Sequence, residues 1–406
     1  MTDDREPTRF KGLGDPKRTM DRSTRRRYLV GLGTALTAGL AGCNDTPAGG
    51  PANGTDASEA AMEFSTEEFR GSGPLAGTRP PLEGPSIEDL PDLDGELTIY
   101  IGGGEGGLYT QLLDKLTSIY PEFSTRPRRA PSTQLANTIV DELEGGNSPA
   151  DVFWAIDAGS LGLVADADGT LELPSDTVDP VPDAFHPDDQ WVGVAGRARS
   201  VPYNTNTYAE SDIPDDVMTL PETGSFDGNI GWAPTYSAFQ AFVTAMRVLE
   251  GESATRSWLE GMQEYVTGSH VYPDEFLVSN AVADGSIGAG FANHYYALRV
   301  KAARPDAPID VAFTSGDAGT LVNTAGVGTI RGTEKRELAE TLVAHLLTVE
   351  AQEFFATRTF AYPMIPGVPP VGGLPAIDEL SPPSLELGEL SDVGPTIELM
   401  RDVGVL

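Results

Sequence analysis

The stretch STQLANTIVDELEGGNSPADVFWAI, residues 132–156, pairs a helical pattern with a buried strand. Its first part, residues 132–146, has apolar residues at the spacing of an amphipathic helix and ends in two glycines. Its last part, DVFWAI (151–156), has the length and composition of a buried strand. Helices that alternate with such strands are typical of α/β proteins.

The same alternation continues on both sides of this stretch. Upstream, LTIYIGG (97–103) predicts a strand and GLYTQLLDKLTSIYP (107–121) predicts a helix that ends at a proline. Downstream, strand patterns fall at 198–207, 229–234, 270–273, 286–294 and 308–316, and helix patterns fall at 237–251, 278–285, 328–358 and 391–403. The sequence therefore predicts an α/β protein with mainly parallel sheets and flanking helices.

The chain is strongly acidic. Its 406 residues include 61 Asp and Glu against 27 Lys and Arg, a net charge of −34. This balance argues against general nucleic-acid binding, which requires basic residues to neutralise phosphates, and against electrostatic docking to anionic lipid. Acidic residues spread along the chain are typical of a surface adapted to high salt, which indicates a halophilic source. Affinity for cations is the other interpretation.

Residues 1–43 have the pattern of an export signal. The twin arginines Arg25 and Arg26 in TRRRYL are typical of the twin-arginine route. The apolar run that follows is shorter than the about 20 residues of a membrane-spanning helix and fits a signal peptide. It ends in LAGC, which resembles the bacterial lipobox, so we expect Cys43 to be lipidated. A free structural cysteine is the alternative, and Met1 and Met20 are both candidate starts.

Residues 44–95 are predicted to form a flexible tether. The segment NDTPAGGPANGTDASEA (44–60) is rich in Gly, Pro, Ala, Ser and Thr and has few large apolar groups. A protein with this leader and tether would stand on the extracellular face of the cell membrane, held there by its lipid anchor only.

Six blocks of sequence carry a family resemblance. They are SPADVFWAIDAGSLG (148–162), WVGVAGRARSVPYN (191–204), GWAPTYSAFQAFVTAMRVLEG (231–251), GFANHYYALRV (290–300), LVNTAGVGTIRGTEK (321–335) and TFAYPMIPGV (359–368). In this order the chain resembles the ferric-ion-binding branch of the family 1 extracellular solute-binding proteins of ABC importers, over roughly residues 96–370. Relatives in the fold also carry other solutes.

The resemblance implies a two-lobed clamshell of the periplasmic-binding type, whose lobes close on a ligand. Its hinge strands would lie near residues 197–203 and 321–330. Residues 96–198 would begin lobe 1, residues 199–320 would form lobe 2, and residues 321–406 would return to lobe 1 and add C-terminal helices. The expected partners are the permease and ATPase subunits of an ABC transporter, and the protein is expected to be a monomer.

In the iron-binding relatives a consecutive tyrosine pair supplies two phenolates, and NHYY places Tyr295 and Tyr296 on that motif. Fe(III) is a hard cation that prefers anionic oxygen, and a bound cation can displace the phenol proton at neutral pH. The pair follows a strand pattern and opens a helix pattern, a junction at which two consecutive side chains can converge. Two half-buried aromatic residues without a ligand are the alternative. A variety of the site with three tyrosines would add Tyr236.

The relatives also bind a companion anion, carbonate or phosphate. Ser237 and Ala238 precede a strong helix, so their N–H groups would face such an anion. Asn293 matches a second anion contact, and Arg197 and Arg199 could pair with carbonate or form a salt bridge at the hinge.

This chain departs from the relatives at three places. No histidine stands near Gly104, and Asp157 lies beside the place where some relatives have a glutamate. Where relatives have Asn-Asn, this chain has Asp274-Glu275, which would repel an anion, replace it as a ligand, or indicate another cation. His294, next to the tyrosine pair, is expected to have a structural or supporting role.

Two other classes of function remain for comparison. The same fold could carry thiamine, a polyamine or another organic cation, caged by the tyrosines and the acidic pair. An exported hydrolase is disfavoured, because the chain has no GxSxG motif and its only cysteine is Cys43. We therefore expect a binding protein and no enzyme.

Overall fold

The computed structural model describes residues 65–103 and 106–406, which belong to one compact unit, Met62–Leu406. The predicted signal residues Arg25, Arg26 and Cys43 lie outside the described residues. Within the described part of the chain, no helix has the length and apolar character needed to cross a membrane.

The first lobe is an α/β layer around parallel strands. Its strands are β1 (Gly95–Gly102), β2 (Phe123–Ala130), β3 (Val152–Ala155) and β4 (Thr170–Leu171). Its helices are α1 (Gly106–Ile119), α2 (Ser132–Glu144), α3 (Ala158–Asp166), α4 (Ser175–Val178), α9 (Arg336–Leu346) and α10 (Val349–Phe354), which continues into the π-helical turn η11 (Phe355–Thr359). β1 pairs in parallel with both β2 and β3. Trp154 of β3 stacks on Tyr109 of α1 at 4.9 Å between ring centroids, so the strand and helix share one core.

The second lobe packs helices around short strands. Its strands are β6 (Ile230–Gly231), β7 (Ala289–Gly290), β8 (Ala292–Asn293) and β9 (Ile309–Ala312). Its helices are α5 (Ser237–Glu250), α6 (Glu252–Tyr265), α7 (Glu275–Ala283) and α8 (His294–Ala303). Phe239, Phe242, Trp258 and Phe291 form an aromatic core in which each ring contacts at least two others.

The 3-10 helices outside the terminal segments are η4 (Asp183–Phe185), η5 (Pro187–Asp189), η6 (Glu210–Asp212), η7 (Val217–Glu222), η8 (Gly224–Phe226), η9 (Gly268–His270) and η10 (Ala318–Thr320).

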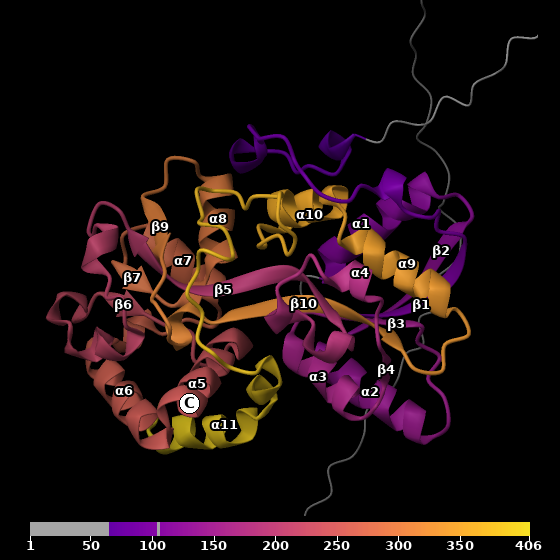
Figure 1. The fold of residues 1–406 in the computed structure, drawn as a ribbon. Coiled ribbons are helices and arrows are strands. Elements are labelled where there is room, and N and C mark those ends of the chain that lie inside the picture. The colour runs from indigo at the N-terminus through magenta and orange to yellow at the C-terminus, as the bar shows by residue number, and fades with distance from the viewer. Residues whose placement is uncertain (1–64, 104–105) are drawn as a thin grey trace, which may run out of the picture. The chain divides into compact units, whose positions relative to one another are not determined.

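Two long strands, β5 (Val192–Asn204) and β10 (Val322–Ile330), join the lobes (Figure 1). β10 pairs antiparallel with the first half of β5, in a register that sets Val322 opposite Ala198. The second half of β5 pairs with β7, β8 and β9 of the second lobe. The predicted hinge strands are therefore present, and the predicted α/β class with two lobes is confirmed.

The prediction of mainly parallel sheets is wrong. Among the described strands, three pairings are parallel and six are antiparallel, in one sheet of order β2-β1-β3-β10-β5-β7-β6 with β4, β8 and β9 beside it. The reason is the hinge: β10 returns from the second lobe to the first and so runs against β5 and β3. The strand–helix alternation in the sequence does not reveal this reversal of direction.

The second half of the predicted tether is packed against the first lobe. Residues 65–94 include η1 (Thr66–Glu68), η2 (Pro74–Ala76) and η3 (Ile87–Asp89), and Phe69, Ile87 and Leu93 enter the main core of that lobe. Residues 65–95 are therefore not a flexible tether, because their scattered apolar side chains pack against residues that are distant in sequence. Residues 44–64 lie outside the described residues.

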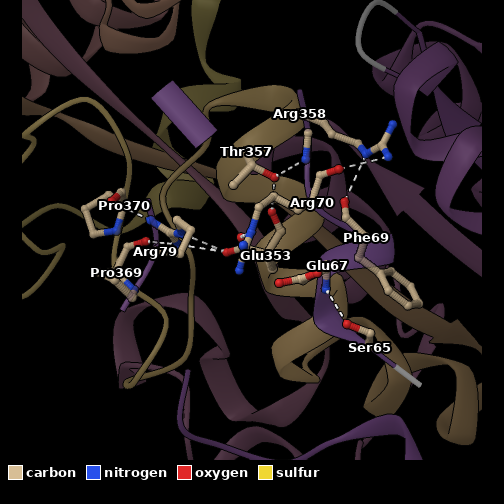
Figure 2. A network of polar contacts seen from close by, with 11 residues as sticks. Ser65, Glu67, Phe69, Arg70, Arg79, Glu353, Thr357, Arg358, Pro369 and Pro370 are labelled. Atoms are coloured by element: carbon tan, nitrogen blue, oxygen red, sulfur yellow. Dashed lines mark hydrogen bonds and ion pairs between the residues drawn. The ribbon is translucent and has the colours of Figure 1, made fainter. Parts of the chain in front are cut away.

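A buried ion cluster fastens this segment (Figure 2). The carboxylate of Glu353 in α10 accepts from Arg70 Nε at 2.6 Å and from Arg79 Nε at 2.9 Å. Arg79 also donates to the carbonyl oxygens of Pro369 and Pro370, and the side chains of Arg79 and Glu353 are 3% and 0% exposed. A buried carboxylate between two guanidinium groups is stable only while all partners are present.

The C-terminal segment leaves the first lobe. The family resemblance instead predicted that residues 321–406 return to lobe 1 and add C-terminal helices. The helix α11 (Val393–Asp402) packs on α5 and α6 of the second lobe, where Leu399 and Met400 join the core. Before it, η12 (Leu387–Ser391) contacts both α3 and α5. The chain therefore crosses between the lobes a third time, after β5 and β10.

We expect Glu353→Ala to lower the free energy of unfolding by about 3–5 kcal/mol, because it leaves the buried guanidinium of Arg79 without its carboxylate. Denaturant unfolding in low and high salt measures this loss, which should persist in high salt because the pair is shielded from solvent. The control is Glu96→Ala, which breaks a surface pair with Arg126 whose side chains are 40% and 72% exposed. It should cost less than about 1 kcal/mol. Equal losses in the two variants would contradict the proposed anchoring of residues 65–94.

Candidate metal centre

Tyr295 and Tyr296 lie on the first turn of α8, directly after β8 ends at Asn293. The expected junction of strand and helix is therefore present. The two residues are 3% and 7% exposed, and their ring centroids are 4.4 Å apart. Consecutive side chains on this turn therefore share one buried position and do not diverge as they would in a strand.

Tyr236 joins this pair from another helix. It is the N-cap residue of α5, and its hydroxyl is hydrogen-bonded to the hydroxyl of Tyr296. The rings of these two residues lie edge to face at 6.2 Å. Tyrosine is an unusual N-cap, since Ser, Thr, Asp and Asn bind the free helix N–H groups far better. The structure thus brings all three predicted tyrosines into one cluster, which lies between the N-termini of two helices.

Burial keeps the Tyr296 hydroxyl protonated in the absence of a cation. Burial raises the pKa of the Tyr296 hydroxyl far above its usual value near 10, and the neighbouring Tyr295 and Tyr236 raise it further. A phenolate at this position therefore requires a positive charge beside it, such as a bound metal ion.

Arg299 supplies positive charge close to the cluster, and the sequence analysis missed it. Its guanidinium carbon lies 4.9 Å from the ring centroid of Tyr295 and 5.4 Å from that of Tyr296. The signal was the spacing: Arg299 follows the two tyrosines by four and three residues, which places all three side chains on one face of a helix.

Phe276 and Phe360 complete the surroundings of the tyrosines. The ring of Phe276, 41% exposed on the first turn of α7, lies 6.4 Å from that of Tyr296. Phe360, which follows η11 in the first lobe, packs on the tyrosine cluster and has a left-handed backbone with φ of 60°. Such a conformation in a bulky residue is costly and is characteristic of functional sites. Neither residue lies within a pattern that could have predicted these contacts.

His294 has a structural role, as expected from its position. Its Nδ1 lies 3.2 Å from the Ala198 N–H on the hinge strand, and its Nε2 lies 2.8 Å from the carbonyl oxygen of Phe360. Burial lowers the pKa of His294 to about 4, so the ring is neutral at neutral pH. Because both ring nitrogens are occupied by backbone groups, neither is available to a metal ion.

Asn293, Arg199 and Glu275 form a polar group behind the tyrosines. Asn293 Nδ2 lies 3.4 Å from the Tyr295 hydroxyl, and Asn293 Oδ1 lies 3.4 Å from Arg199 Nη1. Arg199 Nη1 also forms a buried ion pair with Glu275. Of the two roles left open for Arg199, the structure shows the salt bridge.

The remaining predicted residues have local partners. Asp274 and Asp157 cap α7 and α3, accepting from the N–H groups of Leu277 and Ser160 at 2.8 Å. Arg197 of the hinge strand donates to the carbonyl oxygen of Ile156 at the end of β3.

Ser237 and Ala238 open α5, and no side chain caps this N-terminus. Its N–H groups thus have no side-chain cap, and an uncapped helix N-terminus attracts anions.

The phenols are the candidate metal-binding groups of this cluster. Within residues 65–103 and 106–406, no group of three or more His, Cys, Asp or Glu residues could hold a metal ion. Three phenolate oxygens would give a set of hard anionic donors, which suits a hard trivalent cation. Gly104, where some relatives carry a histidine, lies outside the described residues.

Comparisons with known proteins identify the family of this chain. A model of the bacterial extracellular solute-binding proteins matches residues 122–379. The major ferric iron-binding protein of Neisseria meningitidis serogroup B is 30% identical over 284 residues, 68% of this chain and 83% of that protein. Iron uptake protein A2 of Synechocystis is 29% identical over 275 residues, 64% of this chain and 78% of that protein.

Solved structures share the fold. Iron-bound HitA from Pseudomonas aeruginosa superposes with a TM-score of 0.64 at 27% identity, over 76% of this chain and 99% of that one. The Trichodesmium protein FutA, in complex with iron and citrate, gives a TM-score of 0.65 at 25% identity over the same shares. The two-lobed architecture is therefore that of the periplasmic binding proteins.

We expect His294→Ala to destabilise the protein by about 2–5 kcal/mol, because it opens a cavity and leaves two buried backbone groups without partners. Denaturant unfolding measures the loss. His270→Ala is the control, since His270 is half-buried and its Nδ1 has no hydrogen-bond partner among the described residues. It should cost clearly less, and a similar cost for both would mean that the contacts of His294 do not hold the hinge strand to α8.

Proposed function

Because the chain belongs to the bacterial extracellular solute-binding proteins, we propose that it captures ferric iron at Tyr236, Tyr295 and Tyr296 and delivers it to an ABC importer. The observation that carries the proposal is the cluster of three phenols, two of them buried and one half-buried, at two helix N-termini. Three phenolates would balance the charge of Fe(III), and anionic oxygen is its preferred donor. The cation would in turn stabilise the phenolates that burial disfavours.

The names of the relatives support the same cargo. The Neisseria relative is a ferric iron-binding protein, the Synechocystis relative is an iron uptake protein, and the Trichodesmium structure holds iron with citrate. These relatives are 25–30% identical to this chain. The shared fold alone does not identify the cargo, and the tyrosine cluster is the feature of this chain that supports iron.

The alternative cargo, thiamine, a polyamine or another organic cation, is disfavoured by Arg299. Aromatic cages bind such cations on the faces of their rings. Here the guanidinium of Arg299 already lies over Tyr295 and Tyr296, at 4.9 Å and 5.4 Å from their ring centroids. A second cation without anionic ligands of its own would be repelled, whereas Fe(III) would be bound by the phenolates that Arg299 favours.

A companion carbonate or phosphate, as expected from the sequence, would meet opposing charges. The uncapped N-terminus of α5 at Ser237 and Ala238 would attract it. The carboxylate of Glu275, which accepts from the N–H of Asn293 behind Tyr295, would repel it. The proposal therefore concerns the metal ion and does not require the anion.

We also propose the cellular setting of the protein. Export by the twin-arginine route, with Arg25 and Arg26, and lipidation of Cys43 would place it on the extracellular face of the membrane of a halophile. It would act there as a monomer that binds iron and passes it to the permease and ATPase subunits, with no catalytic step.

Visible spectroscopy of the full chain in high salt tests the metal assignment. A soluble ferric chelate should produce a ferric-tyrosinate band, and Tyr295→Phe and Tyr296→Phe should each abolish most of it, because each removes a phenolate donor. Tyr236→Phe should weaken iron binding by about tenfold or more. Competition with a chelator gives the affinities.

Tyr203→Phe is the matched control, since Tyr203 belongs to the second lobe and is 7% exposed, as Tyr296 is. It should keep the colour of the wild type. A wild-type protein that stays colourless and shows no thermal shift with iron would show that the iron assignment is wrong. Colour that survives in both Tyr295→Phe and Tyr296→Phe would place the metal elsewhere.

A further inference from the structure

The carboxylate of Glu275 contacts both a buried guanidinium group and a helix N-terminus of the site. Glu275 is the first residue of α7 and its side chain is 0% exposed. One oxygen pairs with Nη1 of Arg199 on the hinge strand β5, and the other accepts from the N–H of Asn293 at 2.9 Å. Asn293 is the N-cap residue of α8, which carries Tyr295 and Tyr296. One carboxylate therefore links three elements that form the site.

These contacts are the ones that a small bound anion would make. A helix N-terminus and a buried guanidinium attract carbonate, phosphate and carboxylates for the same reason: free N–H donors and positive charge. Glu275 uses the N–H of the N-cap residue of α8 and the charge of Arg199, which is itself nearly buried with 4% of its side chain exposed. The ion pair is neutral as a whole, so it offers no net charge to a second anion.

We propose that Glu275 is a built-in anion, which makes iron binding at the tyrosine cluster independent of carbonate and phosphate. This inference rests on the proposed function. Asn293 transmits the effect, because its backbone N–H binds Glu275 and its side chain lies 3.4 Å from the hydroxyl of Tyr295. Glu275 is a positioning residue: both of its oxygens are engaged by the protein, so it sets the charge and geometry behind the phenols.

The rest of the guanidinium of Arg199 fits this reading. Its Nη2 is buried without a hydrogen-bond partner among the described residues, and its central carbon lies 5.2 Å from the ring centroid of Phe242. The two N–H donors of this nitrogen are thus left for a neutral oxygen such as water. An incoming dianion would gain these donors but would lie beside the carboxylate of Glu275, and like charges at such short range repel strongly.

The experiment compares iron loading of the full chain with and without anions. The protein is stripped of iron and titrated with a weak ferric chelate in argon-sparged buffer free of bicarbonate and phosphate. Bicarbonate or phosphate is then added, and the intensity of the ferric-tyrosinate band and the affinity from chelator competition are recorded. For the wild type we expect a full band without either anion and an affinity that changes by less than about threefold when one is added.

Glu275→Gln should make iron binding depend on the anion. This substitution leaves the charge of Arg199 uncompensated, so the affinity without anion should fall by about tenfold or more, and added bicarbonate or phosphate should restore most of it. Asp274→Asn is the matched control: it removes the neighbouring negative charge but keeps a good N-cap, and it should behave as the wild type does. The double variant Arg199→Gln with Glu275→Gln removes both charges and should show no rescue by anions.

The wild-type result decides the inference even where a variant does not fold. A wild-type band that forms only with bicarbonate or phosphate would overturn the built-in anion and leave iron binding intact. Anion dependence in Asp274→Asn equal to that in Glu275→Gln would also overturn it, because any loss of acidic charge would then suffice. A wild type without a band under every condition would refute the proposed function, and the inference would fall with it.

Discussion

The pairing of the hinge strand β5 with both lobes is the constraint on which the site depends. Its first half is held by β10 and its second half by β7, β8 and β9. Where the pairing of β5 passes from β10 to the strands of the second lobe, three consecutive residues contact other elements. Arg197 contacts the end of β3, Ala198 binds His294, and Arg199 binds Glu275. β5 therefore holds the tyrosines of α8 in position, because Ala198 binds His294, the residue before them in sequence, and Arg199 binds Glu275, which lies behind them. A change in the angle between the lobes would alter the contacts of these three residues first.

The sequence predicted the parts of this arrangement that depend on local pattern. Tyr295 and Tyr296 stand at a strand–helix junction that the sequence predicted, and Tyr236 precedes a helix that was also predicted, while their choice as metal ligands came from the family resemblance. The partners of Glu275 could not be predicted, since Arg199 and Asn293 lie 76 and 18 residues away and their pairing depends on how α7, α8 and β5 pack. The antiparallel return of β10 and the docking of residues 65–94 were missed for the same reason: both depend on contacts between distant segments. Arg299 is different, because its helical spacing from the tyrosines was visible in the sequence.

The charge around the tyrosines contrasts with that of the whole chain. The protein carries a net charge of −34, whereas Arg299 lies over the rings of Tyr295 and Tyr296 and the buried pair of Arg199 and Glu275 is joined to Tyr295 through Asn293. An acidic surface raises the concentration of cations near the protein at low salt and loses most of that effect in high salt, where the Debye length falls to about 3 Å at 1 M. Capture in a salt-rich medium must then rely on contacts inside the site. The phenols are suited to this, because a ferric ion that replaces their protons is held by direct coordination and not by the long-range field.

The C-terminal segment adds a limit on how the lobes can move. η12 contacts α3 of the first lobe and α5 of the second, and beyond it Arg247 of α5 binds Asp392 and Thr396. On α3 the contact is made at Gly159 and Gly162, where backbone faces backbone: a Cβ on these glycines would lie 3.5 Å from Ser391 N and 3.7 Å from the Cα of Gly388. The contact with the second lobe thus includes ionic and hydroxyl contacts, while the contact with α3 sets two glycines against η12 and packs Leu387 on the core that contains Leu161. A third crossing of this kind restricts the motion to directions that keep α3 and η12 in contact, and the tyrosines, which lie at the N-terminus of α5 and beside it, would travel with η12 as one body.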